Sequence, residues 1–492
     1  MLVAGPTLFA LTGMLLQIPT HPLAGWCAAT AIWMVLWWIS EVVPLATTSL
    51  LPLVLFPILG IMSGKETASA YINPVIFLFI GGFLVAIAMQ RWNLHRRIAL
   101  FLLLRSAGSP QRMLLGFMSA TALLSMWISN TATTMMMVPI ALAVLKSIRS
   151  DLDKREGQML AVAMLLGIAY AASIGGIATL VGTPPNLSLA RILTISFPDA
   201  PELAFNQWMV LALPIALALF VVAFLLLSHR YLASTQAPID IAAIQHEMRH
   251  LGSMRGPEVR VAVVFILLAL LWLFRADLHF GSHVLHGWAH LMPEPAFIND
   301  GVVAIFMALW LFLLPGEAER KRLLDGSAFR DIPWDIVLLF GGGFALATGI
   351  RDSGLALWIA EQSSDLAALP PIIIVSLLCL GVTFMTELTS NTATAETLLP
   401  IVAAVSVALG IHPLLLMIPA TISCSLAFML PVATPPNAIV FGSGQLRVRD
   451  MARTGLLLNL AGVLLVTIGV VMLGPWAFDT DFWQLPSWAH LN

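Results

Sequence analysis

The chain has 492 residues, of which 59% are hydrophobic and only 10% are charged, and its formal net charge is −2. Because about a quarter of the residues in an average soluble domain are charged, this composition excludes a chain that covers itself with a water-facing surface. The small net charge gives no reason to expect a nucleic-acid partner. The cysteines (Cys27, Cys379 and Cys424) are too scattered for a metal motif or a disulfide framework. The sequence therefore predicts an all-α polytopic membrane protein.

The apolar stretches have the length that a bilayer demands, about 17–25 residues. The first of them lacks a basic leader and a small-residue cleavage site, so we expect a retained transmembrane helix and not a cleaved signal peptide. In all we expect about eleven transmembrane helices. The predicted spans are residues 2–18, 23–40, 44–62, 75–90, 158–181, 207–227, 260–274, 299–314, 335–350, 413–432 and 455–475.

Two further apolar stretches, residues 113–145 and 371–410, are longer than one span and carry a Ser-Asn-Thr motif near the middle. Basic residues flank the first stretch on both sides, from Arg91 to Arg112 and from Lys146 to Arg155. The positive-inside rule therefore places both of its ends in the cytoplasm. The flanks of the second stretch are acidic or neutral, which fits the outside face. We expect two re-entrant hairpins entering from opposite faces, a cytoplasmic N-terminus and a C-terminus outside the cell.

The two halves of the chain repeat these motifs in the same order. The motif Ser129–Thr131 recurs 261 positions later as Ser390–Thr392. A Thr-Pro-Pro-Asn motif follows each hairpin, beginning at Thr183 and again 251 positions later at Thr434. Repeats that enter the membrane from opposite faces predict an inverted-topology transporter, with its substrate site at the midplane on broken helices.

The Ser-Asn-Thr motifs have the chemistry to hold an anion beside a small cation. Ser and Asn are preferred N-cap residues. The helix that starts after Thr131 or Thr392 is then expected to point its N-terminus at the pocket, which favours an anion. The hydroxyl, amide and backbone carbonyl oxygens on the other side suit a small cation. The motifs contain no Lys or Arg, so a bound dianion would depend on neutral donors, helix termini and a cation bound beside it.

The Thr-Pro-Pro-Asn motifs predict breaks in two spanning helices. Two successive prolines remove two backbone donors and clash with the preceding turn, so the helix must open there. The opened backbone would leave the carbonyls of Gly182 and Ala433 free to coordinate a cation. Thr183 and Thr434 would present hydroxyls to a ligand.

Three carboxylates lie in apolar surroundings, and the sequence leaves their roles open. An ionisable residue inside a membrane is a functional candidate by default. Glu41 lies at a predicted interface and fits the end of a helix, whereas Glu387 lies three residues before Ser390. The counterpart of Glu387 in the first repeat is Met126, so the position is not shared by both repeats. We include neither these two carboxylates nor Glu396 among the predicted site residues.

The histidines lie outside the repeated motifs, which argues against a membrane enzyme with a catalytic constellation at one depth. The irregular spacing of those in a predicted external loop favours a solvated loop over a metal site. That external set is His279, His283, His286 and His290, and a basic loop holds His246 and His250.

Taken together, the motifs resemble those of the divalent anion/sodium symporter family, over essentially the whole chain. The resemblance implies a homodimer in the bacterial inner membrane, with scaffold and transport domains that work by an elevator motion. It also implies sodium-coupled uptake of C4-dicarboxylates such as succinate, fumarate and malate, with sodium as coupling ion and no cofactor. The segments that carry it are EVVPLATTSLLPLVLFPILGI (41–61), NPVIFLFIGGF (73–83), WISNTATTMMMVPIAL (127–142), GTPPN (182–186), ELTSNTATAETLLPI (387–401) and ATPPN (433–437).

The resemblance also implies which residues bind sodium and substrate. The first sodium ion would be held by Ser125, Ser129, Asn130 and the Gly182 carbonyl, and the second by Thr386, Ser390, Asn391 and the Ala433 carbonyl. The dicarboxylate would lie between Asn130, Thr131 and Thr183 on one side and Ser390, Asn391, Thr392 and Thr434 on the other. We expect scaffold segments at residues 1–106 and 231–366, and transport segments at residues 107–230 and 367–492.

Other functions remain open within the same family, which also includes sodium-independent dicarboxylate exchangers, citrate carriers and sulfate carriers. An exchanger would lack an intact cation cluster, and both clusters are intact here. A channel is disfavoured, because inverted repeats around a midplane site are typical of transporters. The sequence does not identify the preferred dicarboxylate or the number of sodium ions.

Overall fold

The computed structural model describes residues 1–106, 108–148, 153–233, 242–280, 283–317 and 321–491. The regular structure of these residues is helical, apart from one short antiparallel ribbon in the predicted external loop, in which Leu278 pairs with Leu285. The prediction of a helical membrane protein is confirmed, and the ribbon is an addition that the sequence did not indicate.

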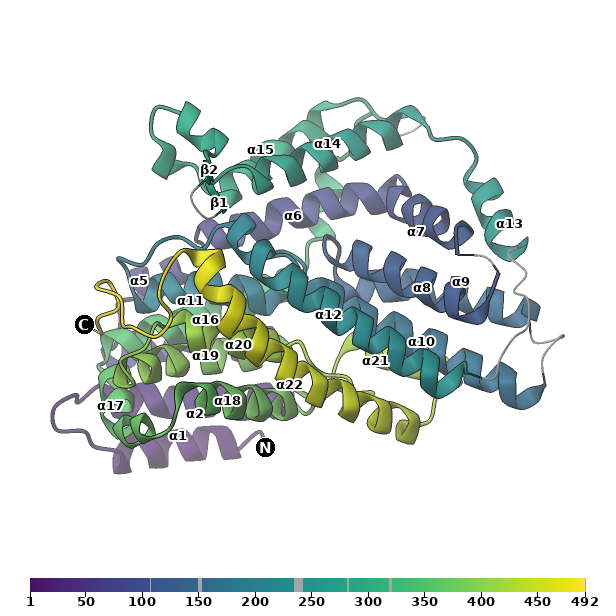
Figure 1. Cartoon of the computed structure of the whole chain (residues 1–492). Helices are drawn as coiled ribbons and strands as arrows, with labels where there is room; N and C mark the ends of the chain where they lie inside the picture. The colour runs from purple at the N-terminus through teal and green to yellow at the C-terminus, as the bar shows by residue number, and fades with distance from the viewer. Residues whose placement is uncertain (107, 149–152, 234–241, 281–282, 318–320, 492) are drawn as a thin grey trace.

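The described part of the chain forms 22 α-helices, many of them short and separated from the next helix by only a few residues (Figure 1). They are α1 (Ala4–Leu15), α2 (Ala24–Ser40), α3 (Leu45–Thr48), α4 (Leu51–Leu59), α5 (Gly64–Tyr71), α6 (Pro74–Arg91), α7 (Leu94–Leu104), α8 (Pro110–Ser125), α9 (Asn130–Ile148), α10 (Lys154–Ile177), α11 (Pro184–Ser196), α12 (Phe205–Tyr231), α13 (Ala242–Leu251), α14 (Gly256–Leu273), α15 (Asp300–Leu313), α16 (Trp334–Asp352), α17 (Leu355–Gln362), α18 (Pro371–Thr386), α19 (Asn391–Ala408), α20 (Leu414–Ser423), α21 (Pro435–Gly442) and α22 (Val448–Phe478). The ribbon consists of β1 (Leu278–Phe280) and β2 (His283–Leu285).

Among the described residues, seven helices are long and apolar enough to cross a membrane, by length and composition only. Six of them coincide with predicted spans, and the seventh is α19, an arm of the second hairpin. The other predicted spans contain shorter apolar helices, because breaks divide them: residues 44–62, for example, form α3 and α4. The structure therefore supports a polytopic membrane protein, and the number of eleven spans stays a prediction.

Both predicted hairpins are present as pairs of helices, and their re-entry into the membrane from opposite faces stays a prediction. Residues 113–145 lie within α8 and α9, and residues 371–410 contain α18 and α19. In each hairpin the two arms meet at the Ser-Asn-Thr motif, and the second arm starts at Asn130 or Asn391. The helices thus begin earlier than expected, because Ser129 and Ser390 occupy the capping position and Asn is already helical.

Both predicted helix breaks are also present, but the opened backbone lies before the prolines. The first break separates α10 from α11, and the second separates α20 from α21. The prolines occupy the first turn of α11 and α21, where a missing backbone donor costs nothing. The predicted spans 158–181 and 413–432 are therefore not single helices, since each ends in open chain.

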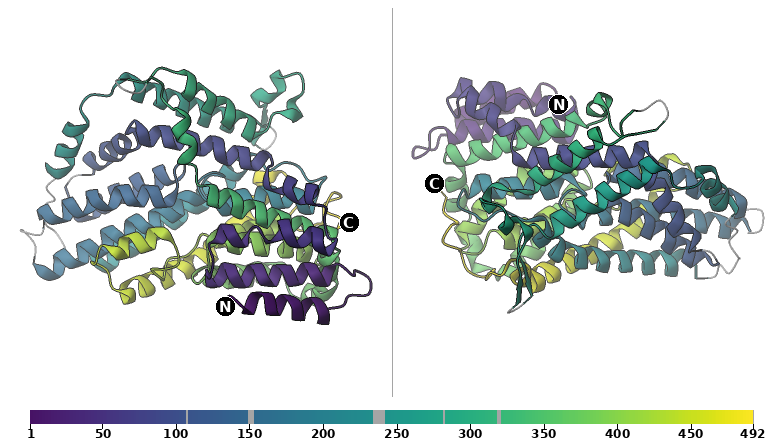
Figure 2. Two further views of the ribbon diagram at one scale, coloured as in Figure 1. Left: turned by 180° about the vertical axis from the view of Figure 1, so that it is seen from behind. Right: turned by 90° about the horizontal axis from the view of Figure 1, so that it is seen from above.

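The helices of the two predicted transport segments pack against one another. α10 lies at the centre, buried along its whole apolar length, and contacts α8, α9, α12 and α21. α22 runs beside α12, although the two are far apart in sequence (Figures 1 and 2). The remaining helices form neighbouring groups, such as α6 with α14 and α15. Helices from different predicted segments also pack together, such as α19 with α16 and α17, and the domain boundaries stay a prediction.

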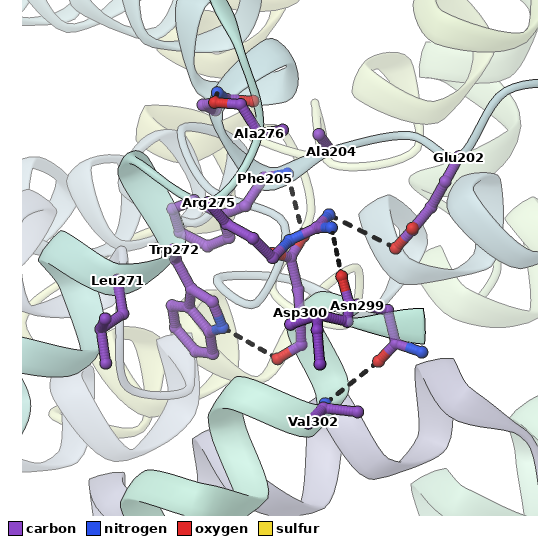
Figure 3. A network of polar contacts seen from close by, with 12 residues as sticks. Glu202, Ala204, Phe205, Leu271, Trp272, Arg275, Ala276, Asn299, Asp300 and Val302 are labelled. Atoms are coloured by element: carbon purple, nitrogen blue, oxygen red, sulfur yellow. Dashed lines mark hydrogen bonds and ion pairs between the residues drawn. The ribbon is translucent and has the colours of Figure 1, made fainter. Parts of the chain in front are cut away.

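A buried ion pair fixes the start of α12 against α14 and α15 (Figure 3). Arg275 donates through Nε to Oδ1 of Asp300 at 2.5 Å, and the two side chains are only 8% and 3% exposed. The backbone N–H of Phe205 donates to Oδ2 of Asp300 at 3.0 Å, and the Trp272 indole donates to its carbonyl. Buried charges need such partners on every side. Three helix ends are thereby joined at one end of the bundle.

Candidate cation and anion site

One cavity of about 890 Å³ brings the repeated motifs together. Both hairpin tips and both helix breaks line it, together with the ends of α2 and α16. Ten of the twelve predicted site residues line this cavity, and the remaining two, Ser125 and Thr386, are buried directly beneath the tips. The residues that line it are Ser129, Asn130, Thr131, Gly182, Thr183, Ser390, Asn391, Thr392, Ala433 and Thr434.

Four helices begin at the wall of this cavity. They are α9, α11, α19 and α21, and their first residues are Asn130, Pro184, Asn391 and Pro435. A helix N-terminus carries a partial positive charge, which favours an anion. In α9 and α19 the first-turn backbone N–H groups add to this charge, whereas α11 and α21 each begin with two prolines, which have no N–H. Among the described residues, the charged ones in the lining are Glu41 and Asp335, and neither Lys nor Arg lines the cavity. The helix ends are therefore the source of positive potential in this cavity.

In the first repeat, a hydroxyl faces more acceptors than it can satisfy. Ser125 Oγ lies 2.5 Å from Oδ1 of Asn130 and 2.7 Å from the carbonyl oxygen of Ala172. A hydroxyl has one proton and donates to one acceptor at a time. With the Asn130 amide oriented in this way, the Ser125 hydroxyl can donate to Asn130 or to Ala172. The other acceptor oxygen then faces Oγ of Ser125 with no proton between the two atoms. A small cation would satisfy both oxygens.

The second repeat has the same arrangement. Thr386 Oγ1 lies 2.8 Å from Oδ1 of Asn391 and 2.8 Å from the carbonyl oxygen of Cys424. Thr386 again has one proton for two acceptors. The two repeats thus build the same surplus of oxygen atoms beneath the two tips, although one uses Ser125 and the other Thr386. This surplus fits the predicted pair of sodium sites.

A glycine leaves room beside the first tip. A Cβ atom added to Gly176 would lie 2.7 Å from Oδ1 of Asn130 and 3.1 Å from the carbonyl oxygen of Gly182. These oxygens therefore converge on a space that a side chain at position 176 would invade. Both belong to the predicted first sodium site, and their convergence is what ligands to one small cation require.

The asparagines of the Thr-Pro-Pro-Asn motifs brace the helix breaks, a role that sequence reasoning missed. In each repeat the side-chain amide donates to the carbonyl groups ten and seven positions upstream. The pairs are Asn186 with Gly176 (3.2 Å) and Thr179 (2.7 Å), and Asn437 with Ala427 (3.0 Å) and Leu430 (3.0 Å). These bonds satisfy carbonyls that the break would leave unpaired. The sequence signal that could have indicated this role is the presence of Asn at the same position of both motifs.

Glu387 holds the second break, which answers the question that the sequence left open. Its Oε1 accepts hydrogen bonds from the backbone N–H groups of Phe428 (2.7 Å) and Met429 (2.8 Å), and from the Asn459 amide (2.8 Å). Its Oε2 accepts from the N–H of Leu430 at 3.0 Å. The carboxylate lies behind the cavity wall and supports the open chain of residues 424–434.

The first repeat achieves the same attachment without a carboxylate. There Thr179, in the first break, donates its hydroxyl to the backbone carbonyl of Met126, the counterpart of Glu387. Thr179 and Leu430 lie at matching positions of the two breaks, 251 residues apart. The two hairpins therefore bind their broken helices differently. Glu387 accepts hydrogen bonds through its side chain, whereas Met126 accepts one through its backbone carbonyl.

We expect Glu387→Gln to loosen the second break. A glutamine offers one acceptor oxygen in place of two, so Leu430 or the pair Phe428 and Met429 loses its acceptor. A buried donor without a partner costs about 1–3 kcal/mol. Thermal unfolding of the purified protein in detergent should show a lower midpoint for this variant. Met126→Leu is the matched control, because only the backbone of residue 126 makes the bond; equal midpoints for wild type and Glu387→Gln would contradict the assignment.

The other two carboxylates occupy different places. Glu41 ends α2 in a left-handed conformation (φ 45°) and lines the cavity, so it is both an end-of-helix residue and part of the wall. Asp335, in the first turn of α16, also lines the cavity and was not predicted. Glu396 is fully buried away from the cavity, where the Ser188 hydroxyl donates to it at 2.5 Å.

The chain matches the family described as "Sodium:sulfate symporter transmembrane region" over residues 8–478. It is 40% identical over 494 aligned residues to the sodium-dependent dicarboxylate transporter SdcS of Staphylococcus saprophyticus, covering 98% of this chain and 92% of the relative. The protein of the same name from Staphylococcus aureus strain MRSA252 has the same identity and coverage.

The fold also has a counterpart among solved structures. The YdaH transporter of Alcanivorax borkumensis superimposes with a TM-score of 0.53, covering 84% of this chain and 88% of that chain. The two sequences are only 15% identical, so this likeness concerns the fold and not the ligand.

Proposed function

The chain belongs to the sodium:sulfate symporter family, and from this premise we propose that it imports C4-dicarboxylates together with sodium ions. It is a transporter and not an enzyme, and sodium is its coupling ion with no further cofactor. The observation that carries the proposal is the meeting of four helix N-termini and two oxygen-rich hairpin tips at one cavity. Relatives named as sodium-dependent dicarboxylate transporters share 40% of its residues.

We place one sodium ion beneath each tip. The first would be bound by Ser125, Ser129, Asn130 and the Gly182 carbonyl, and the second by Thr386, Ser390, Asn391 and the Ala433 carbonyl. The support is the surplus of oxygen atoms at Asn130 and Asn391. A sodium ion there would lie next to the first turn of α9 or α19, so its charge would add to that of the helix end.

The dicarboxylate would bridge the two repeats. One carboxylate would accept hydrogen bonds from Asn130, Thr131 and Thr183, and the other from Ser390, Asn391, Thr392 and Thr434. A site with two equivalent poles suits an anion with a charge at each end better than it suits sulfate, whose charge is compact. The cavity volume of about 890 Å³ also has room for a four-carbon chain.

We propose that this conformation is open to the cytoplasm and that transport uses an elevator motion. The cavity extends to Glu41 and Asp335, at helix ends that the charge pattern places on the cytoplasmic side. A cytoplasmic N-terminus and an external C-terminus in the inner membrane follow from the charge pattern and stay a prediction. The packing of α8–α12 with α20–α22 supports a transport domain that moves as one body. The homodimer stays a prediction.

Competition tests the substrate class. Purified protein in proteoliposomes, given an inward sodium gradient, should accumulate radiolabelled succinate. An excess of unlabelled fumarate or malate should suppress this uptake at least tenfold, whereas sulfate at the same concentration should leave it within a factor of two. Suppression by sulfate equal to that by fumarate would contradict a two-pole dicarboxylate site, and dominant competition by citrate would point to a citrate carrier.

A further inference from the structure

The predicted external loop brings two histidines to one aspartate. Nε2 of His290 lies 2.9 Å from Oδ1 of Asp277, and Nδ1 of His286 lies 3.4 Å from Oδ2. The three candidate ligand atoms all lie within 4.8 Å of one another. The spacing of the histidines in the sequence predicted a solvated loop and not a metal site. The fold changes this interpretation for His286 and His290, because it brings both to Asp277. His283 lies on β2 outside this cluster, and the side chain of His279 lies outside the described part of the chain.

The backbone around this cluster is held in place. Leu278 pairs with Leu285 at the end of the ribbon. Asp277, directly before Leu278, and His286, directly after Leu285, are thereby brought close together. The N–H of Gly287 donates to Oδ1 of Asp277 at 2.8 Å. A Cβ atom on Gly287 would lie 2.1 Å from the carbonyl oxygen of Arg275, so only glycine allows the two strands of chain to approach this closely. The aspartate is thereby presented to the histidines by the fold.

The ligand set suits a borderline transition-metal cation. Two imidazole nitrogens and one carboxylate oxygen are common ligands of Zn²⁺, at about 2.0–2.2 Å from the metal, with water at the remaining position. The ligand atoms must draw together by about 1 Å to reach such distances. The side chains of His286 and His290 are 74% and 55% exposed, so their rings can rotate into place.

We propose that Asp277, His286 and His290 form an external binding site for Zn²⁺, and that its occupancy slows transport. The second part follows from the attachment of this segment to α12. Asn206, in the first turn of α12, donates its side-chain amide to the carbonyl oxygens of Ala276 (3.0 Å) and Asp277 (3.2 Å). The start of α12 belongs to a predicted transport segment and is already tied to α14 and α15 through Asp300. A metal that stiffens residues 276–277 would add a second restraint on this helix end and so oppose the elevator motion proposed above.

Zinc binding is tested first, by isothermal titration calorimetry of metal-free protein in detergent with ZnCl₂. The parent protein in these experiments carries His246→Ala, and every variant is made in this parent. The substitution is needed because His246 and His250 form another exposed imidazole pair, with their Nε2 atoms 3.2 Å apart. We expect one site that weakens at least tenfold in His286→Ala and in His290→Ala. His283→Ala, a histidine of the same ribbon outside the cluster, should stay within a factor of two. No binding by the parent, or equal weakening in His283→Ala, would overturn the site.

The effect on transport is tested separately in proteoliposomes. External ZnCl₂ at a saturating concentration should lower the initial rate of sodium-driven succinate uptake at least threefold in the parent. The double variant His286→Ala/His290→Ala should lose this inhibition and keep its rate without zinc. Zinc binding with the expected variant pattern but without inhibition would contradict the proposed effect of zinc on transport. Absence of succinate uptake in zinc-free vesicles would instead contradict the proposed function, while the calorimetry would still decide the site.

Discussion

Asn130→Ala and Asn391→Ala should each weaken sodium binding by roughly 10- to 150-fold and reduce succinate uptake to near background at moderate sodium. Each change removes an amide oxygen that faces a hydroxyl with too few protons. Hydrogen bonds and contacts that involve a charged partner contribute about 1.5–3 kcal/mol, and each 1.4 kcal/mol corresponds to a factor of ten in affinity. The same amides would also donate to the dicarboxylate, so the maximal rate should fall as well. The measurement is the sodium dependence of initial succinate uptake in proteoliposomes.

The control for these variants lies on the same helix as Asn391. Thr397 bonds through its hydroxyl to the backbone carbonyl of Ala393 in the preceding turn, and it does not line the cavity. Thr397→Ala should leave the sodium dependence within a factor of two. Thermal unfolding in detergent separates a binding defect from misfolding. Normal uptake with unchanged sodium dependence in either asparagine variant would show that the assignment of that tip is wrong.

The hairpins and breaks could be predicted because a few residue types restrict the path of the chain at these positions: basic residues at the ends of the hairpin and prolines at the breaks. A stretch flanked by arginines on both sides cannot cross the membrane once, which made residues 113–145 a hairpin. Two successive prolines exclude a continuous helix, which located the breaks near Thr183 and Thr434. Repetition of both features linked the two halves. The structure confirms the hairpins and the breaks and brings the motifs to one cavity.

Contacts between distant segments could not be predicted in the same way. The partners of Glu387 are backbone N–H groups about forty residues away, and a backbone group carries no signature in a sequence. Asp335 reaches the cavity only because α16 begins beside it. The two histidines meet Asp277 because a short ribbon folds the loop back. Each of these depends on the path of the chain and not on a local pattern.

The lengths of the spans were the other feature that composition leaves undetermined. Hydropathy continues through an open stretch of apolar residues, so residues 158–181 and 413–432 look like whole spans although α10 and α20 end inside them. The break is polar in its backbone and apolar in its side chains. A binding site built from backbone carbonyls is for this reason hidden from a hydropathy profile.

Succinate uptake should depend almost entirely on sodium, because the bound dianion has no cationic side chain to pair with in this cavity. Entry of two negative charges against an inside-negative potential costs about 4.6 kcal/mol per 100 mV, at about 2.3 kcal/mol for each charge. Two sodium ions neutralise the dianion, and a third would let the potential drive uptake. Without sodium, no positive charge would balance the partial negative charges of the oxygen atoms beneath both tips, and these oxygens would repel the bound dianion.

The most direct test measures radiolabelled succinate uptake into proteoliposomes with an inward sodium gradient and with choline in its place. The sodium gradient should raise the initial rate by at least tenfold over choline, and vesicles preloaded with succinate should gain nothing further in choline. Equal uptake in sodium and choline would contradict sodium-coupled symport. Uptake in choline that requires internal succinate would identify a sodium-independent exchanger.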